Sequence, residues 1–85
     1  MTYRFIEDPG HGWLEVSRAE LDALGIANKI SRYSYQRADL VYLEEDCDFA
    51  HFAAAKAAAG QSYQDKIVRV YQENTFVRDL PRFQP

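Results

Sequence analysis

The chain has 85 residues, of which 47% are hydrophobic, 14% aromatic and 27% charged, and its formal net charge is −3. This composition is typical of a folded domain, while scattered basic residues and a small negative charge argue against both a nucleic-acid binder and a mimic of DNA. A chain of this length forms one domain, 1–85, that buries only about 60 to 65% of its unfolded surface, so we expect a partner or a homo-oligomer.

The first part of the chain predicts a β-hairpin. Residues 3–7 form a short aromatic and β-branched run that stops at Asp-Pro-Gly, a sequence typical of a turn, and we expect an edge strand there. Residues 13–16 alternate, with Trp13 and Glu15 on one face, which is the period of a half-buried strand. The two strands can pair with each other.

A short helix is expected directly after this hairpin. Ser17 and Glu20 form the S-x-x-E pattern of a capping box, in which the hydroxyl accepts from the Glu20 amide and the carboxylate reaches back. Gly25 can adopt a positive φ at little cost and is typical of a helix end. Together these signals predict a helix over residues 18–24.

The middle of the chain predicts two more strands. Residues 30–36 alternate in a way that places Tyr33 and Tyr35 on one face, and the polar residues 36–39 favour a turn. Residues 40–43 are continuously apolar, which is typical of a strand buried on both faces. We expect this strand at the centre of the sheet.

The last part of the chain predicts a helix, a strand and an irregular arm. Residues 47–59 are rich in alanine and are followed by Gly60, which indicates a helix that can lie close on a sheet. Residues 66–73 alternate and predict a partly exposed strand. Residues 74–85 contain two prolines and no clear period, so we expect a C-terminal arm that packs on this domain or on a neighbour.

The expected order of elements is therefore β-β-α-β-β-α-β. This order favours the α+β class, with a small mostly antiparallel sheet and two helices on one face. Cys47 is the only cysteine, so the fold cannot depend on an internal disulfide. No stretch approaches the roughly 18 apolar residues of a membrane span, and the N-terminal residues do not resemble a signal peptide, so we expect a cytoplasmic protein.

Four carboxylates lie close together before the alanine-rich helix: Glu44, Glu45, Asp46 and Asp48. At a helix N-terminus they would meet the positive end of the helix dipole and its unpaired amides. With His11 or His51, three of them, Glu44, Asp46 and Asp48, could instead hold a divalent cation, although their spacing is not that of a calcium loop. We expect helix capping and no metal.

Catalysis has one candidate pair in the sequence, Cys47 and His51. The two residues are four positions apart and so share a helix face, and a cysteine near a helix N-terminus can have a lowered pKa. The neighbouring aspartates disfavour a thiolate, and no oxyanion donor or third group accompanies the pair. We therefore expect no catalytic residue, no cofactor and no enzyme activity.

Binding has better candidates, because aromatic and arginine side chains lie near two glycines. Gly-His-Gly-Trp places a histidine beside a large flat ring, which could stack on a base, although the indole could equally belong to the core. Tyrosine and arginine are common at protein interfaces, but they also cover sheets. The candidate binding residues are His11, Trp13, Arg32, Tyr33, Tyr35 and Arg37.

Three blocks of sequence, GHGWLEV, LGIANKISRYSY and VYLEEDCD, occur in this order between residues 10 and 52. In these blocks the chain resembles a family of short uncharacterised proteins encoded by tailed bacteriophages, and the FVRDLPRF tail matches that family more loosely. The resemblance implies a bacteriophage accessory protein in the cytoplasm of an infected bacterial host. It assigns no role to individual residues.

A second resemblance concerns WLEVSRAELDALGI and the two strands expected after it. This segment is similar to the strand, Pro-x-x-Leu helix and LGI pattern of AbrB-type swapped-hairpin transcription factors. Serine replaces the proline here, the Gly-Asp after the helix is absent, and so are the basic residues that read DNA. The resemblance implies a DNA-binding regulator.

Three functions follow as expectations. The first is a binding protein that inhibits a host immune protein, because small bacteriophage accessory proteins without catalytic motifs often act in counter-defence. The second is a protein that sequesters a nucleotide immune messenger, using His11, Trp13, Arg32 and a tyrosine. The third is the AbrB-like DNA-binding regulator.

Overall fold

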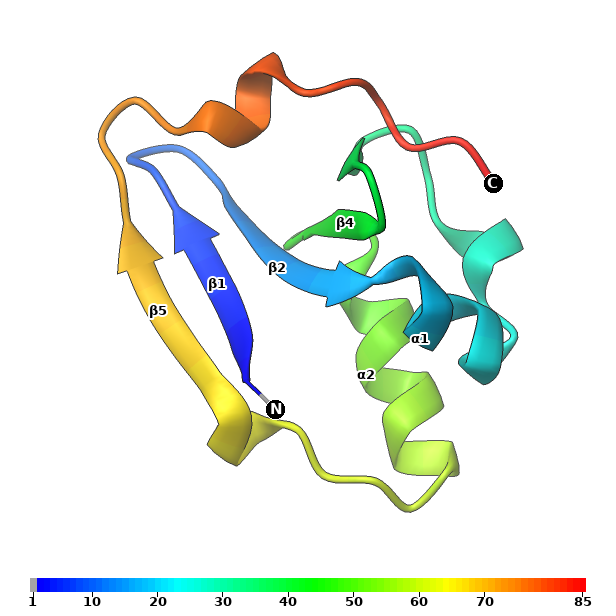
Figure 1. The fold of residues 1–85 in the computed structure, drawn as a ribbon. Helices are drawn as coiled ribbons and strands as arrows, with labels where there is room; N and C mark the ends of the chain where they lie inside the picture. Colours follow the sequence, from blue (N-terminus) through cyan, green and yellow to red (C-terminus); the bar gives the residue numbers. More distant parts are fainter. Residues whose placement is uncertain (1) are drawn as a thin grey trace.

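The structure, a computed structural model, describes residues 2–85 as one sheet with two α-helices and a long C-terminal arm (Figure 1). Among these residues the strands are β1 (Tyr3–Glu7), β2 (Gly12–Ser17), β3 (Tyr35–Arg37), β4 (Leu40–Glu44) and β5 (Ile67–Tyr71). The α-helices are α1 (Arg18–Leu24) and α2 (Phe49–Ala58), and the 3₁₀ helices are η1 (Ala27–Lys29), η2 (Gln64–Lys66) and η3 (Phe76–Asp79).

The sheet has the strand order β3-β4-β2-β1-β5. All neighbouring strands are antiparallel except β1 and β5, which run parallel, so the predicted α+β class with a mostly antiparallel sheet is confirmed. Two details differ from expectation. The strand over residues 3–7 is not an edge strand, because β5 returns beside it, and β2 rather than β4 lies at the centre.

Each face of the sheet carries its own hydrophobic core. On one face Leu14 and Val16 of β2 pack with Leu21 of α1 and Phe52 of α2, so the prediction that both helices cover one face is confirmed (Figure 1). On the other face Trp13 packs with side chains of β1, β3, β4 and the C-terminal arm. Alternate side chains of β2 therefore belong to two different cores, one on each face of the sheet.

The β1–β2 hairpin is the predicted one, and it explains one of the two glycines beside His11. Strand β1 pairs with β2 in the register Phe5↔Leu14. A Cβ built on Gly12 would lie 2.5 Å from the ring of Phe5, whereas a Cβ on Gly10 would meet no atom closer than 3.4 Å. Gly12 is thus required by the close approach of an aromatic ring.

Helix α1 has the predicted bounds, and both its ends use the predicted residues. The Ser17 hydroxyl accepts from the Glu20 amide at 3.1 Å, and Gly25 ends the helix with φ +71°. The Glu20 carboxylate does not complete the capping box, because it accepts from Lys56 Nζ at 2.7 Å and from the Tyr3 hydroxyl. Glu20 raises the pKa of Lys56, so this buried lysine remains charged and ties α2 to α1.

The segment before β3 is the main departure from expectation. A strand was expected over residues 30–36, but only Tyr35–Arg37 is a strand, and a turn occupies residues 31–34. Asp48, which is almost fully buried, holds this turn by accepting from the amide and hydroxyl of Ser31 and from the hydroxyl of Ser34. We call these contacts, with the bond from the Glu44 amide to the Ser34 hydroxyl at 3.0 Å, the Asp48 network.

The Asp48 network also corrects the expected role of the four carboxylates. Helix α2 begins at Phe49 rather than at residue 47, and the side chain of its N-cap, Asp48, makes no capping hydrogen bond. Glu44 is the last residue of β4, and the first turn of α2 contains no acidic residue. The carboxylates therefore do not cap the helix with their side chains.

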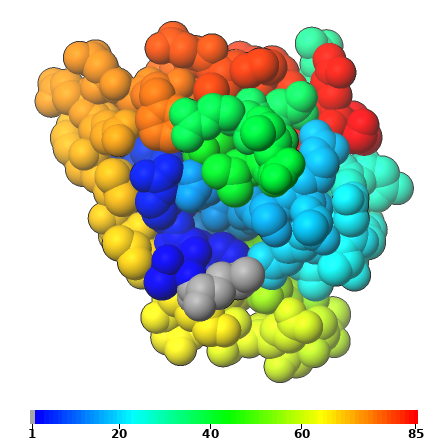
Figure 2. All heavy atoms as spheres, in the orientation of Figure 1, coloured from blue at the N-terminus to red at the C-terminus, as the bar shows by residue number. Residues whose placement is uncertain are grey.

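The C-terminal arm, residues 74–85, packs on this chain. Its first part, with Phe76, Val77 and Leu80, covers the sheet face opposite the helices, whereas Phe83 near its end belongs to the core on the helix side. In Figure 2 the arm lies against the segment around β4. Val77 and Phe83 are buried, the Phe83 amide donates to the Ser34 carbonyl at 2.9 Å, and the Gln36 amide donates to the Pro81 carbonyl at 2.9 Å. These backbone bonds place the end of the arm beside β3.

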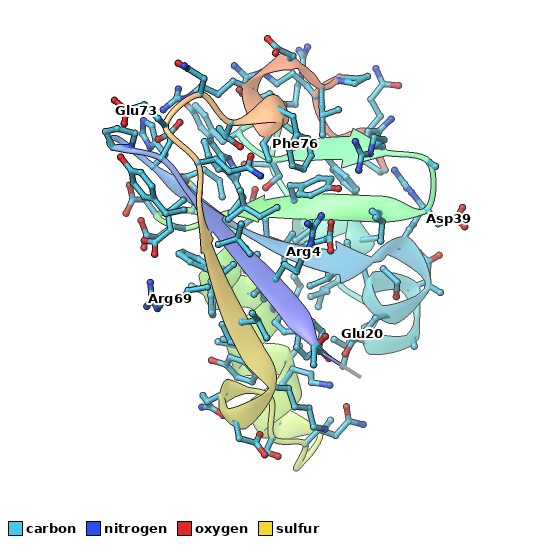
Figure 3. All side chains as sticks on the ribbon, turned by 60° about the vertical axis from the view of Figure 1, so that its left-hand side comes forward. Arg4, Glu20, Asp39, Arg69, Glu73 and Phe76 are labelled. Carbon is cyan, nitrogen blue, oxygen red and sulfur yellow. The ribbon has the colours of Figure 1, made fainter. Side chains whose placement is uncertain are left out.

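A cluster of hydrogen-bonded side chains, Arg4, Glu15 and Tyr42, lies on the same face of the sheet beyond η3. Arg4 donates to both carboxylate oxygens of Glu15, at 3.0 and 2.7 Å, and the Tyr42 hydroxyl donates to Glu15 at 2.9 Å. Figure 3 shows Arg4 and Phe76 on this face, and the Phe76 ring packs edge-on against Tyr42. Arg4 is the first cause of the lowered pKa of Glu15, so the carboxylate stays charged.

Within residues 2–85, neither α-helix is long and apolar enough to cross a bilayer.

Candidate functional site

A pocket of about 380 Å³ opens at the end of β4, between the β1–β2 turn, the turn before β3 and the C-terminal arm. Its aromatic and imidazole lining comes from His11, Trp13, Tyr33 and Tyr35. Glu44, Asp46 and Cys47 form one wall, and Arg78 and Arg82 reach in from the arm. We call this space the β4 pocket.

Four of the six candidate binding residues meet in the β4 pocket: His11, Trp13, Tyr33 and Tyr35. Arg32 lies in an adjoining hollow of about 280 Å³, which it shares with Tyr33 and Arg82. Arg37 reaches neither, because its guanidinium lies over the Phe76 ring, 4.8 Å from the centroid. The structure therefore brings together five of the six residues, in two neighbouring hollows.

The aromatic residues of the pocket differ sharply in exposure. Tyr33 is 65% exposed, whereas Tyr35 is 8% and Trp13 only 2% exposed. Trp13 and Tyr35 pack edge-on, with ring centroids 6.1 Å apart, in the core beneath the arm. Tyr33 is thus the aromatic side chain that is available to a partner, and the other two form the floor of the pocket.

Two arginines of the arm lie over the buried rings. The guanidinium carbon of Arg78 is 5.3 Å from the Trp13 centroid, and that of Arg82 is 4.5 Å from the Tyr35 centroid. Such cation–π contacts stabilise the packing of the arm. Because its ring is already buried and covered in this way, Trp13 is not a stacking platform for a base.

Asp8 fixes both the histidine turn and the arm. Its carboxylate accepts from the amides of Gly10 and His11, at 2.9 and 2.8 Å, which forms the turn that carries the imidazole. It also accepts from Arg78 at 2.5 and 3.1 Å. Arg78, followed by the two amides, holds the pKa of Asp8 well below its usual range. The carboxylate is therefore charged at every ordinary pH.

The acidic wall contains polar atoms without a partner. One oxygen of Glu44, Oε2, accepts from the Asp46 amide at 3.1 Å. Its other oxygen, Oε1, is buried and has no hydrogen-bond partner among the described residues, and neither has Trp13 Nε1. Nδ1 of His11 lies 3.7 Å from this oxygen. Buried polar atoms are normally paired, so Glu44 Oε1 and Trp13 Nε1 are exceptions among the described residues.

Cys47 is exposed at the rim of the pocket and does not have the character of a nucleophile. A side-chain hydrogen bond to the Glu44 carboxylate raises the pKa of the thiol, and partial desolvation and the charges of Glu44, Asp48 and Asp46 add to the effect. The thiol is therefore protonated near neutral pH, and thiols react mainly as thiolates. His51, the other member of the candidate pair, does not line the pocket.

Sequence reasoning missed the two arginines and misassigned the acidic wall. Arg78 and Arg82 follow the prolines and aromatic residues of an arm whose path no local pattern indicates. The position of Glu44 and Asp46 before the alanine-rich helix predicts helix caps instead. The available signal was the position of Glu44 directly after the apolar run 40–43, since a residue at the end of a buried strand is held firmly beside the loops, and loops often carry sites.

Comparison of the chain with protein-family models, with curated proteins and with solved structures gave no match. The resemblance to bacteriophage proteins therefore stays a prediction. The chain's own residues are what supports a function.

The Asp8–Arg78 pair predicts an acid-dependent stability. A carboxyl whose pKa is lower in the folded than in the unfolded state, where it is about 3.9, stabilises the fold above that pH and loses this contribution as the pH falls. Asp8→Asn keeps an acceptor for the turn amides but removes the charge. We expect its melting temperature to lie several degrees below wild type at pH 7, with the difference shrinking between about pH 5 and 2.

Asp79→Asn is the matched control, because it removes the same charge from an exposed side chain of the same arm. Its melting temperature should follow that of the wild type throughout. A gap between wild type and Asp8→Asn that stays constant down to pH 2 would contradict the assignment.

Proposed function

We propose that this chain is a binding protein without catalytic activity, and that it recognises a partner protein at the β4 pocket. The observation that carries the proposal is the position of Tyr33, a tyrosine 65% exposed at the rim of a concave site. Exposed large aromatic rings next to pockets are common anchors of protein interfaces. The pocket volume is within the range of about 300 to 1,000 Å³ that suits a small group or an inserted side chain.

The polar groups around Tyr33 favour a partner that offers hydrogen bonds as well as apolar contact. Trp13 Nε1 is a buried donor without an acceptor among the described residues, and Arg82 adds a positive charge to the lining of the pocket. A carbonyl or carboxylate of a partner would satisfy these donors. The Asp48 network holds the Tyr33 turn in place, which reduces the entropy that binding would otherwise cost.

The biological role we propose is counter-defence, in which the protein inhibits an immune protein of a bacterial host by direct binding. The support for this part is the resemblance to bacteriophage proteins, together with the small size of the chain and the protonated Cys47 thiol. The AbrB-like DNA-binding regulator stays a prediction of the sequence. Three arginines that could contact phosphates, Arg4, Arg69 and Arg78, are each paired with a carboxylate.

The proposal predicts a specific effect of Tyr33→Ala. We expect the immobilised wild-type protein to retain a partner from host lysate and Tyr33→Ala to lose at least ten-fold in retention, while its melting temperature changes little because the side chain is exposed. Quantitative mass spectrometry of the retained proteins measures the first quantity, and thermal unfolding measures the second.

Tyr71→Ala supplies the control, because Tyr71 is 61% exposed but lies on the edge strand β5, outside the β4 pocket. It should retain the partner as the wild type does. Equal retention by Tyr33→Ala, or an equal loss by Tyr71→Ala, would refute the pocket as the binding site.

Sequestration of a nucleotide messenger is a second candidate, and one observation favours it. The hollow next to the β4 pocket is lined by Arg32, Tyr33 and Arg82, which combine two guanidinium groups with an exposed ring. Arginine forks bind phosphates, and tyrosine rings stack on bases. The hollow is open, so we rank this function below protein binding.

The nucleotide candidate predicts a thermal shift. Cyclic dinucleotides and ADP-ribose, each at about 100 times the dissociation constant, should stabilise the fold by about 2.7 kcal/mol. Arg32→Ala should abolish the shift, whereas Arg37→Ala, which changes an arginine outside both hollows, should keep it. Absence of any shift with the wild-type protein would eliminate the candidate.

A further inference from the structure

We propose that His11, Glu44 and Asp46 bind a divalent transition-metal ion, with Zn²⁺ as the best fit. One potential ligand atom from each residue lies within 4.8 Å of the other two. The three come from different parts of the fold, namely the β1–β2 turn, the end of β4 and the loop before α2. We call them the metal triad.

Glu44 is the strongest argument for the metal triad. The residue is 7% exposed, and its Oε1 is buried without a hydrogen-bond partner among residues 2–85. A buried carboxylate oxygen without a partner is costly, and a cation removes that cost directly. The other oxygen is already held by the Asp46 amide at 3.1 Å, which fixes the carboxylate in the way that outer hydrogen bonds orient metal ligands.

The distances need only small side-chain rotations to suit a metal. Ligand bonds of about 2.0 to 2.2 Å around a tetrahedral ion place ligand atoms about 3.4 Å apart. Nδ1 of His11 is 3.7 Å from Glu44 Oε1, and no pair in the triad is separated by more than 4.8 Å. His11 and Asp46 are both exposed, so their side chains are free to close this gap around the fixed Glu44.

The ligand types select the class of ion. Zn²⁺ and related ions accept imidazole and carboxylate ligands together, whereas Ca²⁺ and Mg²⁺ prefer oxygen ligands alone. Three protein ligands leave a coordination position for water or an anion. Trp13 Nε1, a second buried polar atom without a partner, lines the same pocket and could donate to such a group.

The competing explanation is that the His11 side chain alone contacts Glu44. In that case the 3.7 Å approach of Nδ1 to Oε1 is a direct side-chain contact and no metal binds. The metal triad does not depend on the proposed function, because metal binding is measured on the protein alone, without a partner protein. If the metal triad does not bind an ion, binding of a partner protein is unaffected, and the converse also holds.

The test is calorimetric titration of the full chain with Zn²⁺, and separately with Mg²⁺, at neutral pH. We expect one equivalent of Zn²⁺ to bind and to raise the melting temperature, and Mg²⁺ to do neither. His11→Ala and Glu44→Gln should each weaken Zn²⁺ binding at least ten-fold. His11→Ala changes an exposed turn residue, so it remains informative if Glu44→Gln does not fold.

The chain offers a matched control for each variant. His51→Ala removes the other histidine, and Glu45→Gln neutralises the exposed neighbour of Glu44, neither of which belongs to the triad. Both should bind Zn²⁺ as the wild type does. No binding by the wild type would overturn the proposal, as would unchanged binding by His11→Ala or an equal loss in His51→Ala or Glu45→Gln.

Discussion

The buried carboxylate of Asp48 is the contact on which the candidate site depends. It accepts from the Ser31 amide at 3.0 Å, from the Ser31 hydroxyl at 2.7 Å and from the Ser34 hydroxyl at 2.5 Å. Hydrogen bonds to a charged group contribute about 1.5 to 3 kcal/mol each, and a buried carboxylate needs them to offset its lost hydration. Asp48 thereby joins the start of α2 to the turn that presents Tyr33.

The same network connects the two sides of the β4 pocket. The Ser34 hydroxyl accepts from the Glu44 amide, and the Ser34 carbonyl accepts from the Phe83 amide of the C-terminal arm. Glu44 is thereby held in the acidic wall, and the arm, whose Arg78 is fixed by Asp8, supplies further lining of the pocket. A small sheet with a core on each face thus supports a pocket whose walls come from four segments distant in sequence.

Local sequence patterns predict much of the fold. The remaining features depend on contacts between residues far apart in the sequence, which no local pattern indicates. The hairpin, helix α1 and its two end residues follow from patterns within a few neighbours. The turn at residues 31–34 does not, because the bond that fixes it joins Ser31 to a residue 17 positions away. Because Asp48 lies where a helix cap is expected, nothing in the sequence indicates that its carboxylate bonds to Ser31 and Ser34 instead. Four candidate binding residues, which were chosen by residue type, line one pocket. Arg78 could not be chosen in this way, because it meets Asp8 across 70 positions.

Amide hydrogen exchange measured by NMR tests most directly whether Asp48 holds the pocket. In the wild-type protein the Ser31 and Glu44 amides should be protected, because they donate to Asp48 and to Ser34. In Asp48→Ala both should lose protection while the amides of β1 and β2 keep theirs, and Glu45→Ala should leave all of them unchanged. Equal exchange rates of Ser31 and Glu44 in wild type and Asp48→Ala would contradict this account.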